Sequence, residues 1–248
     1  MNKNHGFNEF YFQDIDSDDK AYCLGFIAAD GCIGSKYHLQ ITLAKKDIAI
    51  LRKIQRHLEC RKSVIKRYER DTKVGLCVSS QKIVIDLIDK GVTPRKSLTL
   101  CNVLDWIPDC HAGAFITGYF DGDGSVGIYE YMNKNGITKI RRLQVAICGT
   151  KETLRGICDY IKVSYKRILN LDTLKKNRNI FSLRLQSREE ITQFYSLTLE
   201  KYLDSMPRKR RIFGKVLAYI DKMKDNTRGR REFYGKKLAA KTGIVLPG

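Results

Sequence analysis

Two stretches of the chain have nearly the same pattern, and this internal repeat constrains the fold more than any other feature. They are Tyr22–Gly34 (YCLGFIAADGCIG) and Phe115–Gly127 (FITGYFDGDGSVG), and each runs from an apolar, helix-like segment through Asp-Gly into strand-like residues. Further along, the segments that begin at Leu39 and Leu143 are again similar. Such a duplication predicts two copies of one substructure, related by an approximate two-fold axis.

Each helix-like segment contains a glycine, Gly25 in the first copy and Gly118 in the second. Glycine inside a helix costs about 1 kcal/mol relative to alanine, so its presence predicts that another backbone approaches closely there. Two such helices packed together would place Asp30 and Asp123 side by side at their C-terminal ends. There each carboxylate faces the negative end of its own helix dipole and a like charge. A divalent cation between them would relieve this conflict, so the pattern predicts a site for a hard metal ion such as Mg²⁺.

The repeated segments resemble the motif of the LAGLIDADG homing endonucleases. Cys23–Gly31 (CLGFIAADG) and Ile116–Gly124 (ITGYFDGDG) align with all nine positions of that motif. The resemblance covers roughly residues 16–224 and implies an α+β fold of two pseudo-two-fold αββαββα repeats. In that fold the motif helices form the interface, and two β-sheets form a DNA-binding saddle. The sixth motif position differs between the copies, Ala28 in one and Asp121 in the other, but the eighth is acidic in both.

The resemblance assigns the metal site to the two motif aspartates. Asp30 and Asp123 would share metal ions at the two-fold centre, with the backbone carbonyls of Ala29 and Gly122 as further ligands. Bound metal ions stabilise charge on the attacking and leaving oxygens and supply a water-derived nucleophile, which phosphodiester hydrolysis requires near neutral pH. Mg²⁺ is the expected ion. Mn²⁺ is expected to substitute for it, and Ca²⁺ to bind without supporting cleavage.

Three lysines are expected near this centre. By resemblance, a lysine follows the last helix of each repeat, and the matching residues are Lys96 and Lys209, each within Pro-Arg-Lys. Each ammonium group would either stabilise transition-state charge or organise water, or it would only contact a phosphate. Lys45 ends the second strand of the first repeat, where the family often has a water-organising polar residue. The matching residue of the second repeat is Gly149, so that role is in doubt there.

Two different loop motifs and a simple helix cap fit the Asp-Gly segments less well. Gly122–Gly127 has the spacing G-x-G-x-x-G, but it follows a helix and precedes a strand, the reverse of a dinucleotide-binding turn. Asp121–Ser125 opens like a calcium loop, but Val126 and Met132 stand where that loop needs glycine and glutamate. A helix cap would be enough for one copy, but two copies in register favour a shared site.

Alternating apolar and polar residues predict strands with one buried and one solvent-facing side. The pattern occurs at residues 38–43, 141–148 and 180–187. A polar sheet face can enter the major groove of DNA, since Arg and Gln reach base edges and Lys meets phosphate. The alternative for any one residue is a solvated strand face. The residues expected to contact DNA are His38, Gln40, Thr42, Arg67, Arg70, Arg142, Gln144, Lys166, Arg184, Gln186 and Arg208.

The chain is expected to divide into five segments. These are an N-terminal arm (1–15), the first repeat (16–91), a linker (92–108), the second repeat (109–224) and a basic C-terminal tail (225–248). The tail would either contact DNA without sequence preference or be disordered. Because both repeats lie in one chain, pseudo-two-fold symmetry predicts a monomer.

The net charge limits the kind of partner. The chain has 46 Lys and Arg against 27 Asp and Glu, a net charge of +19, which favours a polyanion. It lacks the run of roughly 18 apolar residues that a membrane span needs, and its N-terminus lacks the apolar region of a secretion signal. The 8 cysteines form no C-x-x-C pair, so buried free thiols in a reducing, intracellular compartment are expected rather than zinc or disulfides.

Together these features predict a site-specific homing endonuclease that makes a metal-dependent, staggered double-strand break in a long DNA target by phosphodiester hydrolysis. Two alternatives use the same fold. One is an RNA-binding intron maturase, which would require intron RNA as a partner, and the other is a catalytically silent DNA-binding regulator. Retention of both Asp30 and Asp123 favours cleavage, because a silent regulator would be expected to have lost at least one of them.

Overall fold

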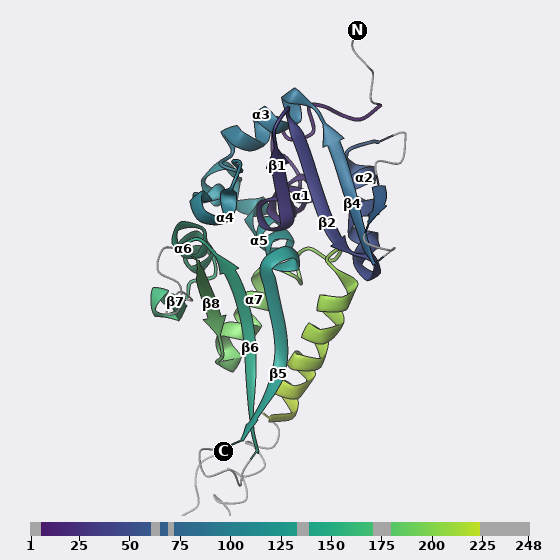
Figure 1. Ribbon diagram of the computed structural model, residues 1–248. Helices are drawn as coiled ribbons and strands as arrows, with labels where there is room; N and C mark the ends of the chain where they lie inside the picture. The colour runs from purple at the N-terminus through teal and green to yellow at the C-terminus, as the bar shows by residue number, and fades with distance from the viewer. Residues whose placement is uncertain (1–5, 61–64, 69–71, 133–138, 171–179, 224–248) are drawn as a thin grey trace, which may run out of the picture.

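The computed structural model describes residues 6–60, 65–68, 72–132, 139–170 and 180–223 (Figure 1). Within this part, the elements form two copies of the predicted order αββαββα. The first copy consists of α1 (Asp18–Asp30), β1 (Gly31–Gly34), β2 (His38–Ala44), α2 (Ile48–His57), β3 (Ile65–Tyr68), β4 (Lys73–Ser79) and α3 (Gln81–Asp89). The second consists of α5 (Asp109–Asp123), β5 (Gly124–Met132), β6 (Lys139–Gly149), α6 (Lys151–Tyr160), β7 (Ile168–Asn170), β8 (Phe181–Leu185) and α7 (Arg188–Leu197).

Shorter elements connect these two copies and follow them. The connecting segment contains the helix α4 (Lys96–Thr99) and a 3₁₀ turn, η2 (Val103–Trp106). A last helix, residues 207–223, follows the second copy and lies beside the long strands β5 and β6 in Figure 1.

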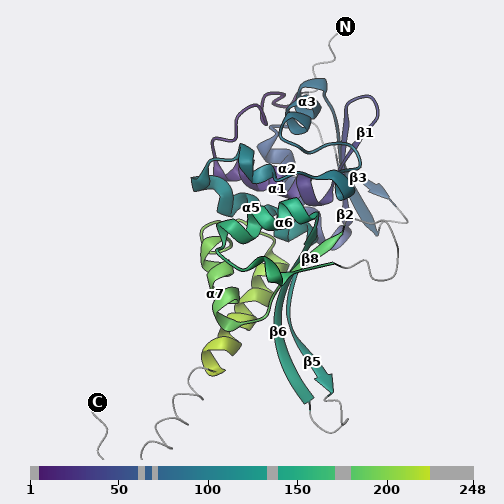
Figure 2. The ribbon, with the colours of Figure 1, turned by 90° about the vertical axis from the view of Figure 1, so that its left-hand side faces the viewer.

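Each copy folds its strands into one antiparallel sheet with the same topology. The strand order is β1-β2-β4-β3 in the first sheet and β5-β6-β8-β7 in the second. Helices α2 and α3 contact the first sheet and α6 and α7 the second, and α1 packs against α5 between the two halves. In Figure 2 the helices lie on one side of the strands, which leaves the opposite face of both sheets uncovered by the described helices.

The alternating strands place their apolar residues as predicted. In β2 the side chains of Leu39, Ile41 and Leu43 are buried, whereas the residues between them are exposed or half-buried. In β6 the buried residues include Leu143 and Val145. Because side chains alternate across a strand, the polar residues lie on the uncovered face of each sheet.

The motif helices α1 and α5 pack with their backbones in direct contact. A Cβ atom added at Gly25 would overlap the carbonyl oxygen of Phe115, and one added at Gly118 would overlap the carbonyl oxygen of Tyr22. The two contacts are equivalent under the internal repeat. Ala21–Ala29 of α1 is buried at every position, because α1 packs on α5 on one side and faces the first sheet on the other. Both glycines are therefore explained by the close approach that the sequence predicts.

The edge strand β7 begins directly after a short 3₁₀ turn. Tyr165–Arg167 forms a 3₁₀ turn, η3, in which the Ser164 side chain accepts a hydrogen bond from the backbone N–H of Lys166 (3.3 Å). Lys166, one of the residues expected to contact DNA, therefore precedes β7, which begins at Ile168. The turn satisfies locally the backbone groups that a strand would have paired.

The cysteines are less buried than the sequence suggests. All 8 are unpaired thiols, but only Cys23 and Cys158 are buried. Cys32, Cys101 and Cys110 are exposed, so the expectation of buried thiols is wrong for these positions. They lie in the edge strand β1, in the segment between α4 and η2, and in the first turn of α5, where the residue type alone does not report exposure.

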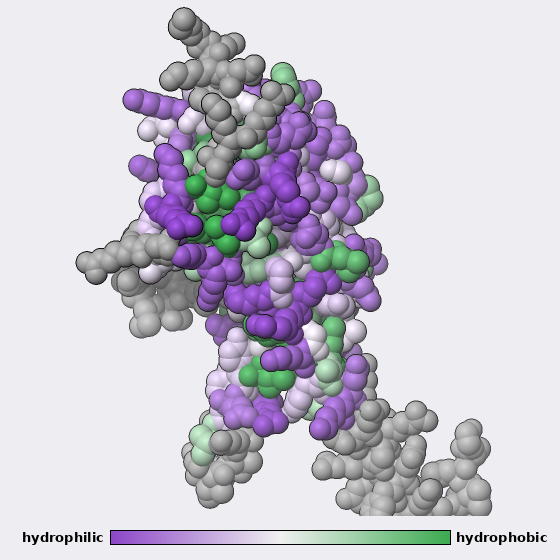
Figure 3. All heavy atoms as spheres, turned by 90° about the vertical axis from the view of Figure 1, so that its right-hand side faces the viewer, coloured by the Kyte–Doolittle hydropathy of each residue, from purple (hydrophilic) through white to green (hydrophobic). Residues whose placement is uncertain are grey.

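The surface is mainly hydrophilic on the side that carries α2, β4 and the helix at 207–223. Figure 3 shows this side, on which apolar side chains gather only in small, separate areas. No helix among the described residues is long and apolar enough to cross a membrane.

The contact between α1 and α5 predicts the effect of adding one methyl group. Gly25→Ala is expected to lower the free energy of unfolding by about 3 kcal/mol or more, since the two backbones would have to separate. Gly214→Ala is the control, because it lies in the helix at 207–223 with no atom within 4 Å of an added Cβ. It should raise stability by about 0.5–1 kcal/mol. Urea denaturation measures both, and equal effects would contradict the proposed close contact.

Candidate active site

The two motif aspartates meet where α1 and α5 end. Each helix stops at its Asp-Gly because Gly31 and Gly124 adopt extended backbone angles and begin the next strand. At Gly122 an added Cβ would overlap the Ala29 side chain and lie 3.5 Å from Cγ of Asp30. The C-terminal ends of the helices therefore touch, and they bring the carboxyl groups of both repeats into one centre.

The carboxyl groups of this centre are electrostatically strained. Burial raises the pKa of Asp30, although the positive charges of Lys209 and Lys96 oppose the shift. Loss of hydration and the negative charge of Asp30 raise the pKa of Asp123 to about 6, although much of this residue is exposed. Two carboxylates that are costly to ionise together are typical of functional sites, and a bound cation would remove that cost.

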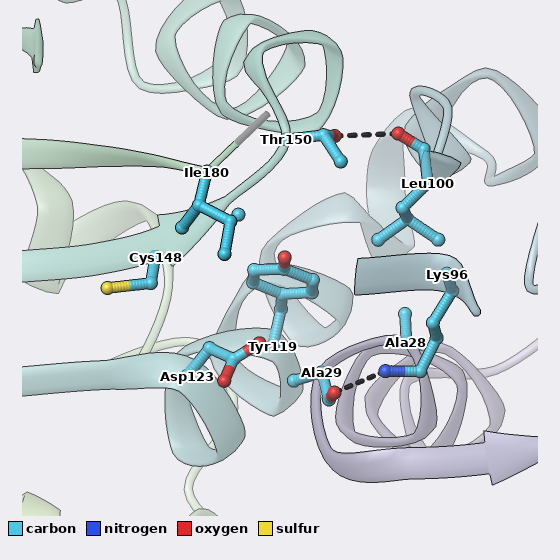
Figure 4. A pocket seen from close by; sticks show the side chains of 10 residues that line it. Ala28, Ala29, Lys96, Leu100, Tyr119, Asp123, Cys148, Thr150 and Ile180 are labelled. Atoms are coloured by element: carbon cyan, nitrogen blue, oxygen red, sulfur yellow. Dashed lines mark hydrogen bonds between the residues drawn. The ribbon is translucent and has the colours of Figure 1, made fainter. Parts of the chain in front are cut away.

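Lys96 and Lys209 cap the ends of the motif helices. The ammonium group of Lys96 donates a hydrogen bond to the carbonyl of Ala29 (Figure 4). That of Lys209 donates to four carbonyls at the end of α5, those of Phe120 (2.6 Å), Asp121 (2.6 Å), Gly122 (3.4 Å) and Gly124 (2.7 Å). Burial lowers the pKa of both lysines, that of Lys209 to about 8. Both ammonium groups thus lie at negative helix ends and beside the paired aspartates.

The donor atoms fit a hard divalent cation. Asp30 and Asp123 offer carboxylate oxygens, and neither accepts a hydrogen bond from the residues that the structure describes. Carboxylate oxygens without other partners are the ligands that Mg²⁺ and Ca²⁺ prefer. The carbonyls of Ala29 and Gly122, expected as further ligands, each accept a hydrogen bond from a lysine. The carboxylates are therefore the stronger candidates for metal ligands.

Asp121, at the sixth motif position, has a structural role. Its Oδ2 accepts hydrogen bonds from the Tyr22 hydroxyl (2.8 Å) and from the backbone N–H of Met206 (2.5 Å). It is 2% exposed, and it ties α1 and α5 to the segment that leads into the helix carrying Lys209. The first repeat has Ala28 at this position and makes no such link.

A second cluster of ionisable groups lies at the other end of α1. Asp19, His57 and Asp204 come close enough together to hold a metal ion. Lys53, however, forms an ion pair with Asp204 (3.1 Å), and its ammonium group lies 4.4 Å from the centre of the Tyr202 ring. The lysine already supplies positive charge to this cluster. We therefore regard it as a link between the two repeats and not as a metal site.

The uncovered faces of the sheets form the predicted saddle. Seven of the residues expected to contact DNA lie on this face. They are His38, Gln40 and Thr42 in β2, Arg142 and Gln144 in β6, Arg184 in β8 and Gln186 just after β8. Two of them are already oriented by each other, since the Gln186 side-chain amide donates to that of Gln144 (3.0 Å). Arg142 stacks over the ring of Tyr131, with 5.5 Å from its guanidinium carbon to the ring centre.

The prediction that Arg67 shares the saddle face is wrong. Arg67 pairs with Val74, and Ile65 pairs with Leu76, both buried core residues. Paired residues of antiparallel strands lie on the same face, so Arg67 lies on the helix side of the sheet. Side chains alternate between the two faces of a strand, so residues two positions apart share a face. Ile65 therefore marks the buried face on which Arg67 also lies.

The other predicted cations lie at the margins of the sheets. Lys45 and Lys166 are exposed and belong to 3₁₀ turns, η1 (Lys45–Asp47) and η3. Arg208 is paired with Asp47 through two hydrogen bonds of 3.3 and 3.2 Å, which join the last helix to the start of α2. Arg70 lies outside the described residues.

Two residues that were not expected from the sequence lie on the saddle face. Lys66 pairs with Gly75, which pairs with Thr42, so Lys66 is on the face that Arg67 was expected to occupy. Tyr129 pairs with Arg142 and is 36% exposed. The alternation of side chains along β3 was enough to identify Lys66 as a residue of the saddle face. Tyrosine is too common in strands for Tyr129 to indicate a contact with DNA.

Comparisons with known proteins identify the fold. No protein-family model and no curated protein matches the chain. The LAGLIDADG meganuclease I-CpaMI, solved bound to uncleaved DNA, is 18% identical and has a TM-score of 0.57, with 86% of this chain and 95% of that chain covered. The homing endonuclease I-LtrWI, solved bound to target DNA, is 16% identical with a TM-score of 0.58 and coverages of 96% and 99%.

A third structure contains calcium. I-SmaMI, bound to an uncleaved DNA target in the presence of calcium ions, is 13% identical with a TM-score of 0.56, over 82% of this chain and 92% of that chain. The chain therefore has the two-repeat α+β fold of the LAGLIDADG homing endonucleases over almost its whole length.

The raised pKa of Asp123 predicts a pH-dependent gain in stability when its charge is removed. In the folded metal-free protein, ionisation between about pH 4 and about pH 6 costs stability because the folded pKa lies above the unfolded value. Asp123→Asn should therefore raise the unfolding temperature more at pH 8 than at pH 4. Calorimetry in EDTA tests this, with the exposed Asp14→Asn as control. An equal increase in the unfolding temperature at pH 4 and at pH 8 would contradict the predicted cost of ionising Asp123 in the folded protein.

Proposed function

We propose that the protein is a site-specific, metal-dependent DNA endonuclease of the LAGLIDADG homing type, which makes a staggered double-strand break by phosphodiester hydrolysis. The observation that carries this proposal is the meeting of Asp30 and Asp123 at the touching ends of two pseudo-two-fold helices. One carboxyl group from each repeat matches one scissile phosphate from each DNA strand. A binding module without catalysis would have no need of this strained pair.

The active centre would hold Mg²⁺ between the two aspartates. The bound ion would supply charge stabilisation and a water-derived nucleophile. The ammonium groups of Lys96 and Lys209 lie at the same helix ends, and they would neutralise phosphate charge or orient water while capping the helices. The burial that lowers the pKa of Lys209 to about 8 leaves it mostly charged at neutral pH.

Duplex DNA would lie across the saddle face. The chain has a net charge of +19, and on that side Gln40 and Lys66 project from the first sheet and Arg142, Gln144 and Arg184 from the second. Arginine and glutamine contact base edges in the major groove, whereas phosphate contacts supply most of the affinity. Structures of the same fold were solved with DNA, which supports this placement. Since one chain supplies both repeats, the protein would act as a monomer.

Cleavage itself is the first test. The protein with Mg²⁺ and a randomised duplex library should produce site-specific double-strand breaks, recovered by sequencing the cut ends. Asp30→Asn and Asp123→Asn should each reduce the rate by about 10³-fold or more, because each removes a carboxylate that the metal ion requires. Asp14→Asn should cut normally. DNA binding without cleavage of any duplex would favour a silent regulator, and selective binding of intron RNA would favour a maturase.

The saddle predicts different roles for two arginines. Arg184→Ala should weaken binding to the selected target and reduce the discrimination at one base pair, by about 1–3 kcal/mol if the guanidinium reads a base edge. Arg67→Ala is the matched control, since it removes the same charge from the helix side of the first sheet. Fluorescence anisotropy at several salt concentrations measures the DNA affinity of both variants. A larger loss for Arg67→Ala would contradict the assignment of the DNA-binding face.

A further inference from the structure

A pocket of about 220 Å³ lies beside Asp123. It is bounded by α1, α5, α4 and the junction of β6 with α6, and both Asp123 and Lys96 line it (Figure 4). Ala28, at the sixth motif position, forms part of its wall. In the second repeat the same motif position is Asp121, whose carboxylate accepts hydrogen bonds from the Tyr22 hydroxyl and the Met206 backbone N–H.

The hydroxyl group of Tyr119 projects into this pocket. Tyr119 is 2% exposed, and in Figure 4 its ring rises from α5 so that the hydroxyl points into the pocket, toward Thr150 and Leu100. Within the described part of the chain, this hydroxyl makes no hydrogen bond to the protein, and the nearby Thr150 hydroxyl donates to the Leu100 carbonyl (2.6 Å). Among the described residues, the Tyr119 oxygen is not one of the side-chain oxygens that are enclosed without a partner, so water can reach it. Water in the pocket would satisfy it.

The pocket has the size and polarity that ordered water needs. A single water molecule requires roughly 10–15 Å³ by this measure of volume and between two and four polar partners. Tyr119, Lys96 and Asp123 all line this pocket and each carries a polar group, so it can hold several waters beside the Asp123 carboxylate.

The two repeats differ at both residues that make this arrangement. The motif position of Tyr119 is Phe26 in the first repeat, which has no hydroxyl. A Cβ added at Gly149 would lie 2.5 Å from the Tyr119 oxygen, so a side chain at this position would displace the hydroxyl. The residue that corresponds to Gly149 is Lys45, which is exposed. The tyrosine oxygen thus takes the space that a side chain at position 149 would occupy.

We propose that Tyr119 is a positioning residue that, with Lys96, orders water in this pocket against Asp123 for hydrolysis at one of the two scissile phosphates. The first repeat has Phe26 at the motif position of Tyr119, so the two DNA strands would be cut by differently built centres. In the step, the water oxygen forms a bond to phosphorus, and the bond between phosphorus and the leaving sugar oxygen breaks. The attacking water gives a proton to a neighbouring water in the pocket. The leaving oxygen takes up a proton from solvent. This inference rests on the proposed nuclease function.

Strand-resolved cleavage tests the proposal. With each strand of the target carrying its own label, Tyr119→Phe should slow cleavage of one strand by about tenfold or more and the other by less than about twofold. Nicked duplex should then accumulate. Tyr22→Phe is the matched control, because it removes a buried hydroxyl that bonds to Asp121 and lies outside the pocket. Equal slowing of both strands by Tyr119→Phe, or no change in their ratio, would overturn the proposal.

A second variant tests the exchange between tyrosine and lysine. In Tyr119→Phe combined with Gly149→Lys, the close contact at 2.5 Å is gone, and the next neighbours of the new Cβ are at 3.5 and 3.6 Å. The lysine would stand where Lys45 stands in the first repeat, and it should restore at least part of the lost rate for the slow strand. A folded double variant without any restoration would show that the pocket group does not position water.

Stability supplies a readout that does not depend on cleavage. If the Tyr119 hydroxyl bonds only to water, Tyr119→Phe should leave the unfolding temperature of the metal-free protein within about 1 °C, whereas Tyr22→Phe should lower it by about 2–4 °C. An equal decrease for both would make the hydroxyl a structural contact and overturn the proposal. If the wild-type protein cut neither strand, the nuclease function would fail. If it cut both and Tyr119→Phe left the strand ratio unchanged, only this inference would fail.

Discussion

The backbone contact between α1 and α5 is the constraint on which the rest of the structure depends. Gly25 and Gly118 each meet a carbonyl oxygen of the facing helix, so the two helices approach as closely as their main chains allow. This distance brings the two Asp-Gly ends into contact and thereby creates one shared centre from two repeats. It also fixes the two sheets relative to each other, because each motif helix leads directly into the first strand of its own sheet. A wider helix pair would separate the carboxyl groups and change the curvature of the saddle.

The close packing creates an electrostatic problem that the surrounding chain only partly solves. Two helix dipoles and two carboxyl groups direct negative charge to one point, and Lys96 and Lys209 offset part of it by capping the helix ends. The burial that lowers the pKa values of these lysines shows that the compensation is itself costly. The remaining strain, visible in the raised pKa of Asp123, is the property that makes the centre suited to a cation.

The repeated motif was sufficient to predict the fold, the helix interface and the two aspartates, because each depends on a local pattern that occurs twice. The lysines could be placed only by resemblance, and their hydrogen bonds to helix-end carbonyls could not be foreseen. Arg67 was placed on the wrong face, although Ile65, the only aliphatic residue of the short edge strand β3, marks the buried face that Arg67 shares. The pairing of Arg208 with Asp47 and of Asp121 with Tyr22 joins residues far apart in the sequence, and no periodicity reports such contacts.

The link from Asp121 to Tyr22 also limits how this chain could be rebuilt from one of its halves. In a homodimer of the second repeat, the residue facing each Asp121 would be Phe115, the counterpart of Tyr22, which has no hydroxyl to donate. Each buried carboxylate would then lose a hydrogen-bond donor. In a homodimer of the first repeat, Ala28 would provide no acceptor for Tyr22. The two halves have therefore become complementary rather than interchangeable, and the ancestral symmetry cannot be restored without changing both sides of this contact.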